Sequence, residues 1–530
     1  MKIYHVDCTL RDGGYYNNWN FSKKFVQDYL NAVSNINLDC IEIGFRFIKN
    51  DLSLGNCAYS TDKFLNSIET KKVKVPLAVM LNASEFINLE KNKLIKTCNS
   101  LFVKKNKSKI SIVRIACRLS EIEKIGTLIS ILKRKGYQVI INLMQISLLN
   151  SKQIKFASTL VNKFGVRVLY IADSIGSLKP KEVIKIIQII KKKFKGQVGV
   201  HMHDNMKLAL SNTIVAKESG ATWLDSTING MGRGAGNTCT EDLLYFVSKN
   251  RKNFKISKFE KYIEENFSNL KKKFNWGSNI FYKLSALYNI HPTYIQELLK
   301  DKRHSKEEKL NIIEFLKINK SETYSKKLLT FPRKIKNNYS FNGRISSRDL
   351  TKKREFLIFG AGESVGKYKK KIINYIKNRK PYVISVNYNK FIPEKYIDNY
   401  SVLNLERFVI DFKYYLDSKK KIILPRLLME SHFGKNRLLK LRIINYGTRI
   451  RKNKFIIFKN YSEIPNSLTA TYALSFIIAC KAAKITFAGF DGYEDKNILN
   501  KEMNSLFDLI SKNFKLIKIN SITPTTYKIN

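Results

Sequence analysis

His201-Met202-His203-Asp204-Asn205 follows the apolar run Gln197–Val200, and this stretch decides the interpretation of the first half of the chain. Side chains alternate between the two faces of a strand, so His201 and His203 are expected to point the same way at the strand end. Two imidazoles on one face can hold a metal ion. A matching acidic segment, Asp7-Cys8-Thr9-Leu10-Arg11-Asp12-Gly13-Gly14, lies near the amino terminus. Together the two segments favour a metal-dependent enzyme over a binding module.

Short β-rich runs alternate with amphipathic stretches through this half. The eight strand candidates are Ile3–Thr9, Cys40–Phe45, Val75–Leu81, Ser111–Ala116, Gln138–Leu143, Val168–Ala172, Gln197–His203 and Trp223–Thr227. The helix candidates between them include Ser22–Asn35, Ser120–Lys135, Lys152–Phe164, Pro180–Lys195 and Asn205–Ser219. Strand–helix alternation predicts a parallel sheet. Eight such repeats within about 250 residues predict an α/β fold of the (β/α)8, or TIM, barrel type.

Polar residues stand in or after the carboxyl ends of these runs, where barrels of this type place their active sites. They are Asp12, Glu42, Arg46, Asn82, Arg114, Asn142, Asp173, Ser174, His201 and His203. Any one of them could be a strand-end cap or a turn former. As a set they favour an active site at that end of the barrel.

The rest of the chain divides into a charged helical stretch and a second α/β region. The helix candidates are Lys258–Lys273, Asn279–Tyr288, Pro292–Leu299 and Ser305–Ile318, and Thr330–Arg348 resembles a linker. A strand beginning at Phe356 then runs into a glycine turn and the helix Lys367–Lys377, and further strands are expected at Tyr382–Asn387, Ile422–Pro425, Phe455–Phe458 and Ile485–Ala488. We therefore predict a barrel over 1–255, a helical extension and linker over 256–345, and a Rossmann-like α/β domain over 346–530.

Composition limits the class of protein. A chain of 530 residues with 44% hydrophobic residues suggests two or three folded domains. The formal net charge of +53 comes from scattered lysines, which favours solvated basic surfaces over a specific nucleic-acid site. Seven cysteines without a CxxC pair indicate a reducing compartment. Neither a signal peptide nor a membrane-spanning run is expected, so the cytoplasm is the predicted location.

Three ordered motifs resemble those of the pyruvate-carboxyltransferase-like, or HMG-CoA-lyase-like, barrels. They are the Asp7–Gly14 segment, the His201–Asn205 segment and Gly230-Met231-Gly232-Arg233-Gly234-Ala235-Gly236-Asn237. That superfamily includes 4-hydroxy-2-oxovalerate aldolase, HMG-CoA lyase, isopropylmalate synthase and homocitrate synthase. The resemblance covers about residues 1–250.

The resemblance implies a role for each matching residue. Asp12, His201 and His203 would be the metal ligands, with Asn237 a further ligand as in the HMG-CoA lyase branch. This mixed oxygen and nitrogen set suits Mn²⁺ or Mg²⁺, with Zn²⁺ as the alternative. The metal would hold a 2-oxo acid and stabilise its enolate. Arg11 would stabilise the enolate charge, unless it only forms a salt bridge to Glu42. With Arg11 and His201, Ser174 would contact the substrate, unless it only caps a helix.

Two positions differ from the family pattern. The aldolase has a general-base histidine three residues after the ligand aspartate, where this chain has Tyr15. A phenol titrates near 10 and is a poor base at neutral pH, so Tyr15 is expected to donate a proton, orient a water or shape the pocket. Cys239 lies past the position of the catalytic cysteine of HMG-CoA lyase, which argues against that activity.

The glycine turn Gly360-Ala361-Gly362-Glu363-Ser364-Val365-Gly366 permits two interpretations. Gly360, Gly362 and Gly366 could bind a nucleotide phosphate, or they could form a tight structural turn. NAD is disfavoured, because the second strand ends in Asn387 and not in an acidic residue. The segment from Thr469 to Tyr493 weakly resembles bacterial sialyltransferase-like domains, which suggests a nucleotide-sugar or glycan partner and a role in surface polysaccharide synthesis.

The predicted function is a metal-dependent carbon–carbon lyase of the aldolase type that acts on a 2-oxo acid with an aldehyde or acyl partner. A Claisen-type acyl-condensing enzyme is the alternative within the superfamily. A carbohydrate-related scaffold that has lost activity is the alternative from another class. A homo-oligomer is expected, without specific nucleic-acid binding.

Overall fold

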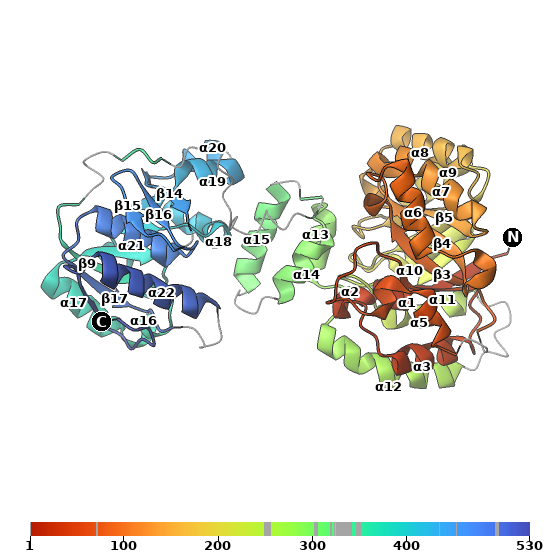
Figure 1. Ribbon diagram of the computed structural model, residues 1–530, viewed down its shortest axis with the longest axis horizontal. Coiled ribbons are helices and arrows are strands. Elements are labelled where there is room, and N and C mark those ends of the chain that lie inside the picture. Colours follow the sequence, from red (N-terminus) through yellow and green to blue (C-terminus); the bar gives the residue numbers. More distant parts are fainter. Residues whose placement is uncertain are drawn as a thin grey trace. The chain divides into compact units, whose positions relative to one another are not determined.

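The computed structural model describes residues 2–69, 73–247, 256–300, 306–318, 321–322, 324, 342–345, 351–433, 435–451, 453–492 and 498–529. The chain forms two compact units (Figure 1). The first contains residues 1–304 and 316–324, and the second contains residues 305–315 and 325–530. The predicted division into three parts at 255 and 345 stays a prediction. The linker expected over 330–348 lies outside the described residues, apart from 342–345.

Eight parallel strands of the first unit close into a barrel, which confirms the predicted TIM fold. They are β1 (Tyr4–Asp7), β2 (Cys40–Phe45), β3 (Leu77–Asn82), β4 (Ile110–Cys117), β5 (Gln138–Leu143), β6 (Val168–Asp173), β7 (Gln197–Met202) and β8 (Trp223–Ser226). Pairing of β1 with β8, from Tyr4 opposite Trp223 to Asp7 opposite Ser226, completes the closure. The predicted first strand extends too far, because Thr9 already begins a short helix.

Helices follow the strands around the barrel (Figure 1). The longer ones are α3 (Lys23–Val33), α6 (Lys91–Leu101), α7 (Gly126–Arg134), α8 (Ser151–Lys163), α9 (Pro180–Lys191), α10 (Ala209–Glu218) and α11 (Thr240–Val247). The short helices α1 (Thr9–Asp12), α2 (Gly14–Asn17), α4 (Asn56–Tyr59) and α5 (Asp62–Asn66) lie in loops. Side-chain caps begin several of them: Ser22 accepts the N–H of Phe25, and Asn150 accepts that of Gln153. A side-chain oxygen at this position satisfies an N–H that lacks a helical partner.

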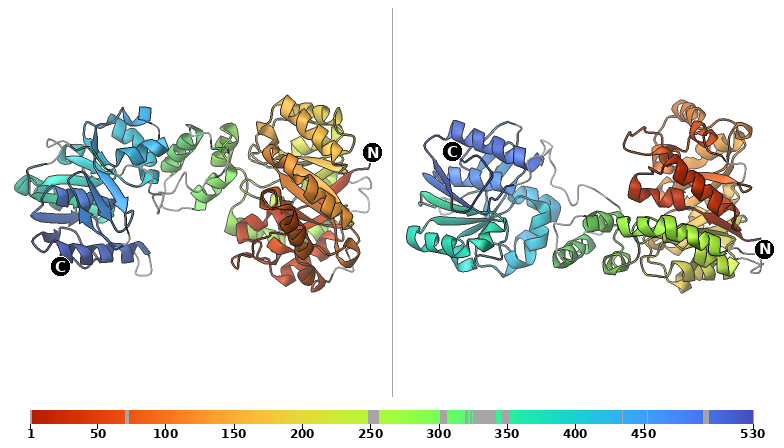
Figure 2. Two further views of the ribbon diagram at one scale, coloured as in Figure 1. Left: turned by 45° about the horizontal axis from the view of Figure 1, so that its top comes forward. Right: turned by 90° about the horizontal axis from the view of Figure 1, so that it is seen from below.

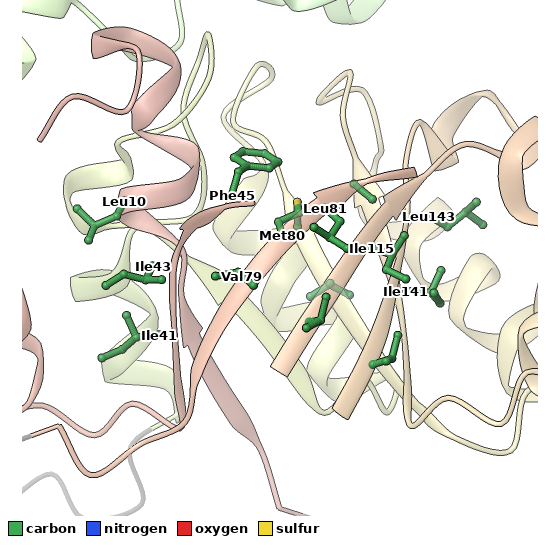
Figure 3. Close-up of a cluster of buried hydrophobic side chains, with 14 of the residues drawn as sticks. Leu10, Ile41, Ile43, Phe45, Val79, Met80, Leu81, Ile115, Ile141 and Leu143 are labelled. Carbon is green, nitrogen blue, oxygen red and sulfur yellow. The ribbon is translucent and has the colours of Figure 1, made fainter. Parts of the chain in front are cut away.

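Alternation along the strands separates two apolar layers. Outward-facing residues such as Ile41, Val79, Ile115 and Ile141 pack between the strands and the helices (Figure 3). Inward-facing residues fill the barrel interior, where the rings of Tyr4 and Trp223 are stacked with centroids 4.4 Å apart.

Tyr170 and Gly199 form a matched pair in this interior. The Tyr170 ring is buried, and a Cβ added at Gly199 would lie 2.5 Å from it. Glycine at position 199 therefore gives the tyrosine ring its space.

The helices that follow the barrel are α12 (Ile256–Phe274), α13 (Ile280–Leu287) and α14 (Pro292–Lys300). Figure 2 shows α12, in yellow-green, along the outside of the first unit, where its Phe267 packs on Phe25 of α3 with ring centroids 5.7 Å apart. We call residues 276–300 the helical cap, because they contact loops at the carboxyl end of the barrel.

Three hydrogen bonds show this placement of the cap. Trp276 Nε1 donates to the carbonyl of Asn229 over 2.9 Å, in the loop after β8. The amide of Asn205, after β7, donates to Ser285 Oγ over 3.3 Å, and Gln296 Nε2 donates to the carbonyl of Tyr15 over 3.4 Å. The cap therefore lies at the end of the barrel where the polar residues gather.

The second unit contains a parallel seven-stranded sheet of order β13-β12-β11-β10-β9-β17-β18. Its strands are β9 (Glu355–Phe359), β10 (Tyr382–Val386), β11 (Asn399–Ser401), β12 (Lys421–Leu424), β13 (Ile443–Asn445), β17 (Lys484–Ala488) and β18 (Lys518–Ser521). Its helices are α15 (Lys306–Ile318, of which residues 316–318 group with the first unit), α16 (Ser364–Lys367), α17 (Lys369–Arg379), α18 (Leu405–Asp417), α19 (Arg426–Phe433), α20 (Lys435–Leu438), α21 (Thr469–Ala479) and α22 (Ile498–Asn513). The order differs from the 3-2-1-4-5-6 of a dinucleotide-binding fold, so the Rossmann-like assignment stays a prediction.

A small second sheet in this unit corrects one expected strand. Residues 455–458 were expected to extend the main sheet, but β15 (Ile456–Ile457) pairs antiparallel with β16 (Tyr461–Ile464), which also pairs with β14 (Gly447–Ile450). The prediction of a strand at this apolar run was correct. It pairs with the neighbouring strand β16, because a tight turn after β15 returns the chain beside it.

Candidate metal centre and active site

Asp12, His201 and His203 come together as predicted at the carboxyl end of the barrel. One ligand atom from each lies within 4.8 Å of the others, and all three residues are buried. Asp12 ends the helix α1 directly after β1, His201 lies in β7, and His203 follows that strand. The two imidazole rings are 5.1 Å apart in an edge-to-face arrangement, so they occupy the same side of the strand.

His201 is oriented by a residue that the sequence analysis did not single out. Its Nδ1 bonds to Asp225 Oδ2 of β8 over 3.0 Å, which places the proton on that nitrogen. The Nε2 atom then directs a lone pair towards Asp12 Oδ2, 2.9 Å away. Two acceptors this close repel each other unless a cation or a proton lies between them. A carboxylate behind a histidine is the usual support of a metal-binding imidazole, so this pair fits a metal ion.

Unpaired atoms on neighbouring side chains also fit a metal. His203 Nδ1 and Asn237 Oδ1 are buried without a hydrogen-bond partner among the described residues. Asn237 Nδ2 lies 3.1 Å from His201 Nε2, and a Cβ at Gly232 would fall 1.6 Å from Asn237 Oδ1. Gly232 thus leaves room for the amide. Because the amide nitrogen faces the imidazole, the role of Asn237 as a ligand stays a prediction.

Asp12 and His203 carry the charges that suit a cation, whereas hydrogen bonds to Asp12 and Asp225 outweigh burial and raise the pKa of His201, whose proton a metal ion would displace. Burial would raise the pKa of Asp12, but the Arg11 guanidinium and His201 outweigh it and hold that pKa well below its usual range. Burial lowers the pKa of His203 well below its usual range, which keeps this imidazole neutral. Ionised carboxylate and neutral imidazole are the forms that bind metals.

Arg11 forms the salt bridge to Glu42 that was its alternative, and its role in stabilising an enolate stays a prediction. Its Nε donates to Glu42 Oε2 over 2.7 Å, and its Nη1 lies 3.2 Å from Asp12 Oδ2. Its Nη2 has no hydrogen-bond partner in the described part of the chain, although the side chain is buried. The salt bridge to Glu42 therefore exists and leaves one donor beside the metal ligands.

A buried network beside the candidate metal ligands was predicted only in part. Arg114 Nη2 bonds to Asp225 Oδ2 over 2.6 Å, and its Nη1 lies 3.2 Å from Glu42 Oε2. Its guanidinium also stacks on Tyr170 at 4.3 Å. Arg114 and Glu42 were recognised as polar strand residues, whereas Asp225 was not. An acidic residue at an inward position of a short apolar strand was the signal that could have identified it.

Tyr15 lies beside the site on α2. Its ring packs edge-on against Trp19 and Phe45, with centroids 4.9 and 6.3 Å away. Burial raises the pKa of its phenol, although the charge of Arg233 lowers it. Tyr15 is therefore protonated at neutral pH and suited to donate a proton, not to accept one.

Ser174 follows β6 at the edge of the site. Its Oγ accepts the N–H of Gln145 over 3.2 Å, and its carbonyl accepts a bond from Arg233 over 2.9 Å. Ser174 does not cap a helix, because α9 begins at Pro180 after Lys179, and the turn after β6 is closed by Asp173, whose carboxylate accepts the N–H groups of Gly176, Ser177 and Leu178. Its contact with a substrate carboxylate stays a prediction.

The thiol of Cys239 shows no sign of activation. Burial raises its pKa further above the ordinary thiol value, so the thiolate is disfavoured.

In the second unit, the geometry of the glycine turn favours the structural interpretation. A Cβ at Gly360 would lie 2.7 Å from the carbonyl oxygen of Gly489, and one at Gly362 would lie 2.6 Å from the Asp491 carboxylate. Asp491 also accepts the backbone N–H of Ser364 over 3.0 Å, at the start of α16. This carboxylate occupies the position that a phosphate would need. Nucleotide binding by Gly360, Gly362 and Gly366 stays a prediction that this contact does not favour.

Comparison with known proteins identifies the first half of the chain. Residues 2–263 match the HMGL-like family model. The barrel is an HMGL-like domain. A 4-hydroxy-2-oxovalerate aldolase of Pelotomaculum thermopropionicum is 28% identical over 250 residues, which are 47% of this chain and 70% of that protein. An oxaloacetate decarboxylase of Mycobacterium tuberculosis is 25% identical over 244 residues, 45% of this chain and 68% of that protein.

Solved structures also resemble the HMGL-like domain. The N-terminal domain of an aldolase-like protein from Bacteroides vulgatus is 30% identical to this chain, with a TM-score of 0.49. The match covers 56% of this chain and 96% of that domain. HMG-CoA lyase from Bacillus subtilis is 18% identical, with a TM-score of 0.41, over 50% of this chain and 94% of the lyase. The family and the relatives make this chain an enzyme of the aldolase and lyase kind. Within the described residues, no helix is long and apolar enough to cross a membrane.

Proposed function

We propose that this protein is a divalent-metal-dependent carbon–carbon lyase that cleaves or forms 2-oxo acids through a pyruvate-like enolate. One observation carries the proposal: Asp12, His201 and His203 bring ligand atoms within 4.8 Å of one another beside the free Nη2 of Arg11. Asp12, His201 and His203, with Asn237 as a further candidate, would hold Mn²⁺ or Mg²⁺, or else Zn²⁺. Such a cation supplies Lewis-acid polarisation of the keto oxygen of the substrate.

The side chains around the ligands supply charge and orientation. Arg11 directs its unpaired Nη2 towards the oxygen on which negative charge develops, and a buried donor of this kind is effective because it does not reorganise. Ser174 would hold the substrate carboxylate through its hydroxyl. Asp225 keeps the His201 ring in one orientation and one tautomer.

The bond chemistry follows from this arrangement. In the cleaving direction the bond between C3 and C4 of a 4-hydroxy-2-oxo acid breaks, the hydroxyl proton leaves to a base, and the electron pair forms the enolate. In the condensing direction a base removes a methyl proton from pyruvate to give the enolate, the enolate carbon attacks an aldehyde, and the aldehyde oxygen takes up one proton, so that no net proton is gained or lost. A protonated Tyr15 is suited to provide this proton, and its phenolate would take the proton back in the cleaving direction.

The replacement of a basic side chain by Tyr15 also keeps a second candidate open. A Claisen-type enzyme uses the same enolate with an acyl donor and needs no base for a hydroxyl proton. Observation of an acyl transfer product with pyruvate would select this candidate. We also propose a role of the second unit in surface polysaccharide synthesis. This proposal rests only on the resemblance of residues 469–493 to sialyltransferase-like domains.

Exchange of pyruvate methyl protons with deuterium tests the proposed function. The purified protein with Mn²⁺ should catalyse this exchange in D₂O, as followed by proton NMR, and a chelator should stop it. The matched variant His201→Ala should retain the fold but lose both bound metal and exchange. Absence of exchange with Mn²⁺, Mg²⁺ and Zn²⁺ would reject the enolate mechanism for pyruvate.

A further inference from the structure

Arg233 is a cationic residue at the carboxyl end of the barrel. It lies in the glycine-rich loop after β8, and no carboxylate among the described residues lies within ion-pair distance of it. Its Nη2 donates to the Ser174 carbonyl over 2.9 Å, while its Nε is buried without a hydrogen-bond partner in the part of the chain that the structure describes. A buried donor without a partner is costly, and guanidinium groups are suited to bind oxyanions through two parallel bonds.

The position of Arg233 is between the metal ligands and the helical cap. On one side, its guanidinium lies 5.8 Å from the centroid of the Tyr15 ring. On the other, the neighbouring Gly234 lies against the cap, since a Cβ there would be 3.0 Å from the Tyr282 ring and 3.5 Å from Pro292. Arg11 already provides a donor at the metal ligands. Arg233 is therefore placed for a part of the substrate that extends towards the cap.

The helical cap also offers a hydrogen-bond donor, His291, for an anion beside Arg233. His291 precedes Pro292, and its Nδ1 accepts the N–H of Thr293 over 3.3 Å, so Nε2 carries the proton and can donate. Burial, followed by the charges of Arg233 and Arg118, lowers the pKa of His291 to about 3. Arg118, whose side chain is 46% exposed, lies 4.0 Å from Glu121.

We propose that Arg233 binds an oxyanion on the second reactant, and that the enzyme therefore selects aldehydes bearing a carboxylate or a phosphate. This inference rests on the proposed function, because it assigns the partner of the enolate. Arg233 is thus a specificity-determining residue. The enolate-forming half of the reaction should depend on it far less than the bond-forming half does.

Matched aldehydes test the proposal. Condensation with pyruvate should be measured for glycolaldehyde against glycolaldehyde phosphate, and for acetaldehyde against glyoxylate. The natural protein should prefer at least one anionic member by 10-fold or more in kcat/KM, and the pair that shows the preference distinguishes phosphate from carboxylate. Equal rates within both pairs would overturn the proposal.

Variants then assign the preference to Arg233. Arg233→Gln keeps a donor for the Ser174 carbonyl but loses the charge, and it should lower kcat/KM for the preferred anionic aldehyde about 10- to 100-fold. Arg233→Lys should recover part of that loss. Arg118→Gln at the same mouth is the control, and an equal loss there would show a general positive field and overturn the assignment.

The two halves of the reaction separate this proposal from the proposed function. If Arg233→Gln lowers pyruvate deuterium exchange as much as condensation, Arg233 acts on the 2-oxo acid and the proposal is wrong. If the natural protein shows no exchange at all, the proposed function fails. Binding of glycolaldehyde phosphate and glyoxylate to the Mn²⁺-loaded protein, measured by calorimetry, still tests Arg233 in that case, because only the natural protein and not Arg233→Gln should bind the preferred one.

Discussion

Asp225 connects the candidate metal ligand His201 with the interior of the barrel through a single oxygen atom. Its Oδ2 is 3.0 Å from His201 Nδ1 and 2.6 Å from Arg114 Nη2. The positive charge of Arg114 holds Asp225 ionised against the cost of burial, and lowers its pKa. The residue touches no substrate in the proposed function, so it acts by positioning His201.

Asp225→Asn should weaken metal binding without abolishing it. The amide keeps one contact with His201 but loses the charge that fixes the tautomer, and loss of such a partner typically costs 10- to 100-fold in metal affinity. Titration with Mn²⁺ followed by electron paramagnetic resonance measures the effect. His201→Ala gives the reference for complete loss, and Mn²⁺ affinity equal to that of the natural protein would contradict the positioning role.

Arg11→Ala should separate metal binding from turnover. Asp12, His201 and His203 remain in this variant, so metal content after purification should stay near one ion per chain. Removal of a preorganised donor costs about 10²- to 10³-fold in kcat, so pyruvate exchange should fall by that factor. Exchange at the natural rate would refute the role of Arg11 in stabilising the enolate, and loss of the metal would show that its contact with Asp12 is structural.

At the scale of elements, β1 and the residue after it carry titratable side chains on both faces of the strand. Cys8 follows the strand on the inner face near Arg114, whereas His5 and Asp7 face outward. His5 Nε2 lies 2.6 Å from Ser226 Oγ of β8, and burial lowers the pKa of this imidazole to about 3. A histidine kept neutral in the folded state makes the barrel sensitive to acid.

The sign of this effect follows from proton linkage. The unfolded chain binds a proton at His5 near pH 6.5, whereas the folded chain does not until about pH 3. The stability contribution is therefore complete above pH 6.5 and is lost as the pH falls towards 3. At pH 4.5 the loss amounts to about 3 kcal/mol.

His5→Gln should reduce the loss of stability between pH 7 and pH 4.5 by about that amount. Glutamine can still bond to Ser226 but does not titrate. Urea unfolding followed by tryptophan fluorescence at the two pH values gives the comparison. Parallel pH dependences of the variant and the natural protein would show that His5 is protonated in the folded state.

Sequence patterns predicted the regular elements better than the contacts between them. The bounds of β2 and β5 were predicted correctly, because each is a short run rich in β-branched residues. The strands β11, β13 and β18 were missed, since three or four residues such as Asn399–Ser401 carry no period. Asp12, His201 and His203 were found through their motifs. The unpaired donors of Arg11 and Arg233, and the contact of Asp225 with His201, depend on spatial neighbours that spacing does not reveal.

At the scale of the whole molecule, the chemistry is concentrated in one of the two compact units. Both groups of candidate metal-binding side chains found among the described residues lie in the barrel. The three tryptophans of the chain, Trp19, Trp223 and Trp276, also belong to the first unit. Tryptophan fluorescence therefore reports on this unit alone.

Mn²⁺ should raise the unfolding temperature that tryptophan fluorescence measures. A ligand that binds only the folded state adds RT ln(1 + [L]/Kd), which is about 2.7 kcal/mol at 100 times Kd. Calorimetry of the full chain should show this shift in one transition and leave a second transition unchanged. The variant His201→Ala should show neither shift. A metal-dependent change in both transitions would mean that the two units unfold together.

The contact between Tyr170 and Gly199 has a consequence for the history of this barrel. Neither position can change alone without a collision or a void, because a methyl group at 199 would already occupy the space of the ring. Aligned descendants of a common ancestor should therefore show linked replacements: a bulkier residue at 199 should occur only with a smaller one at 170.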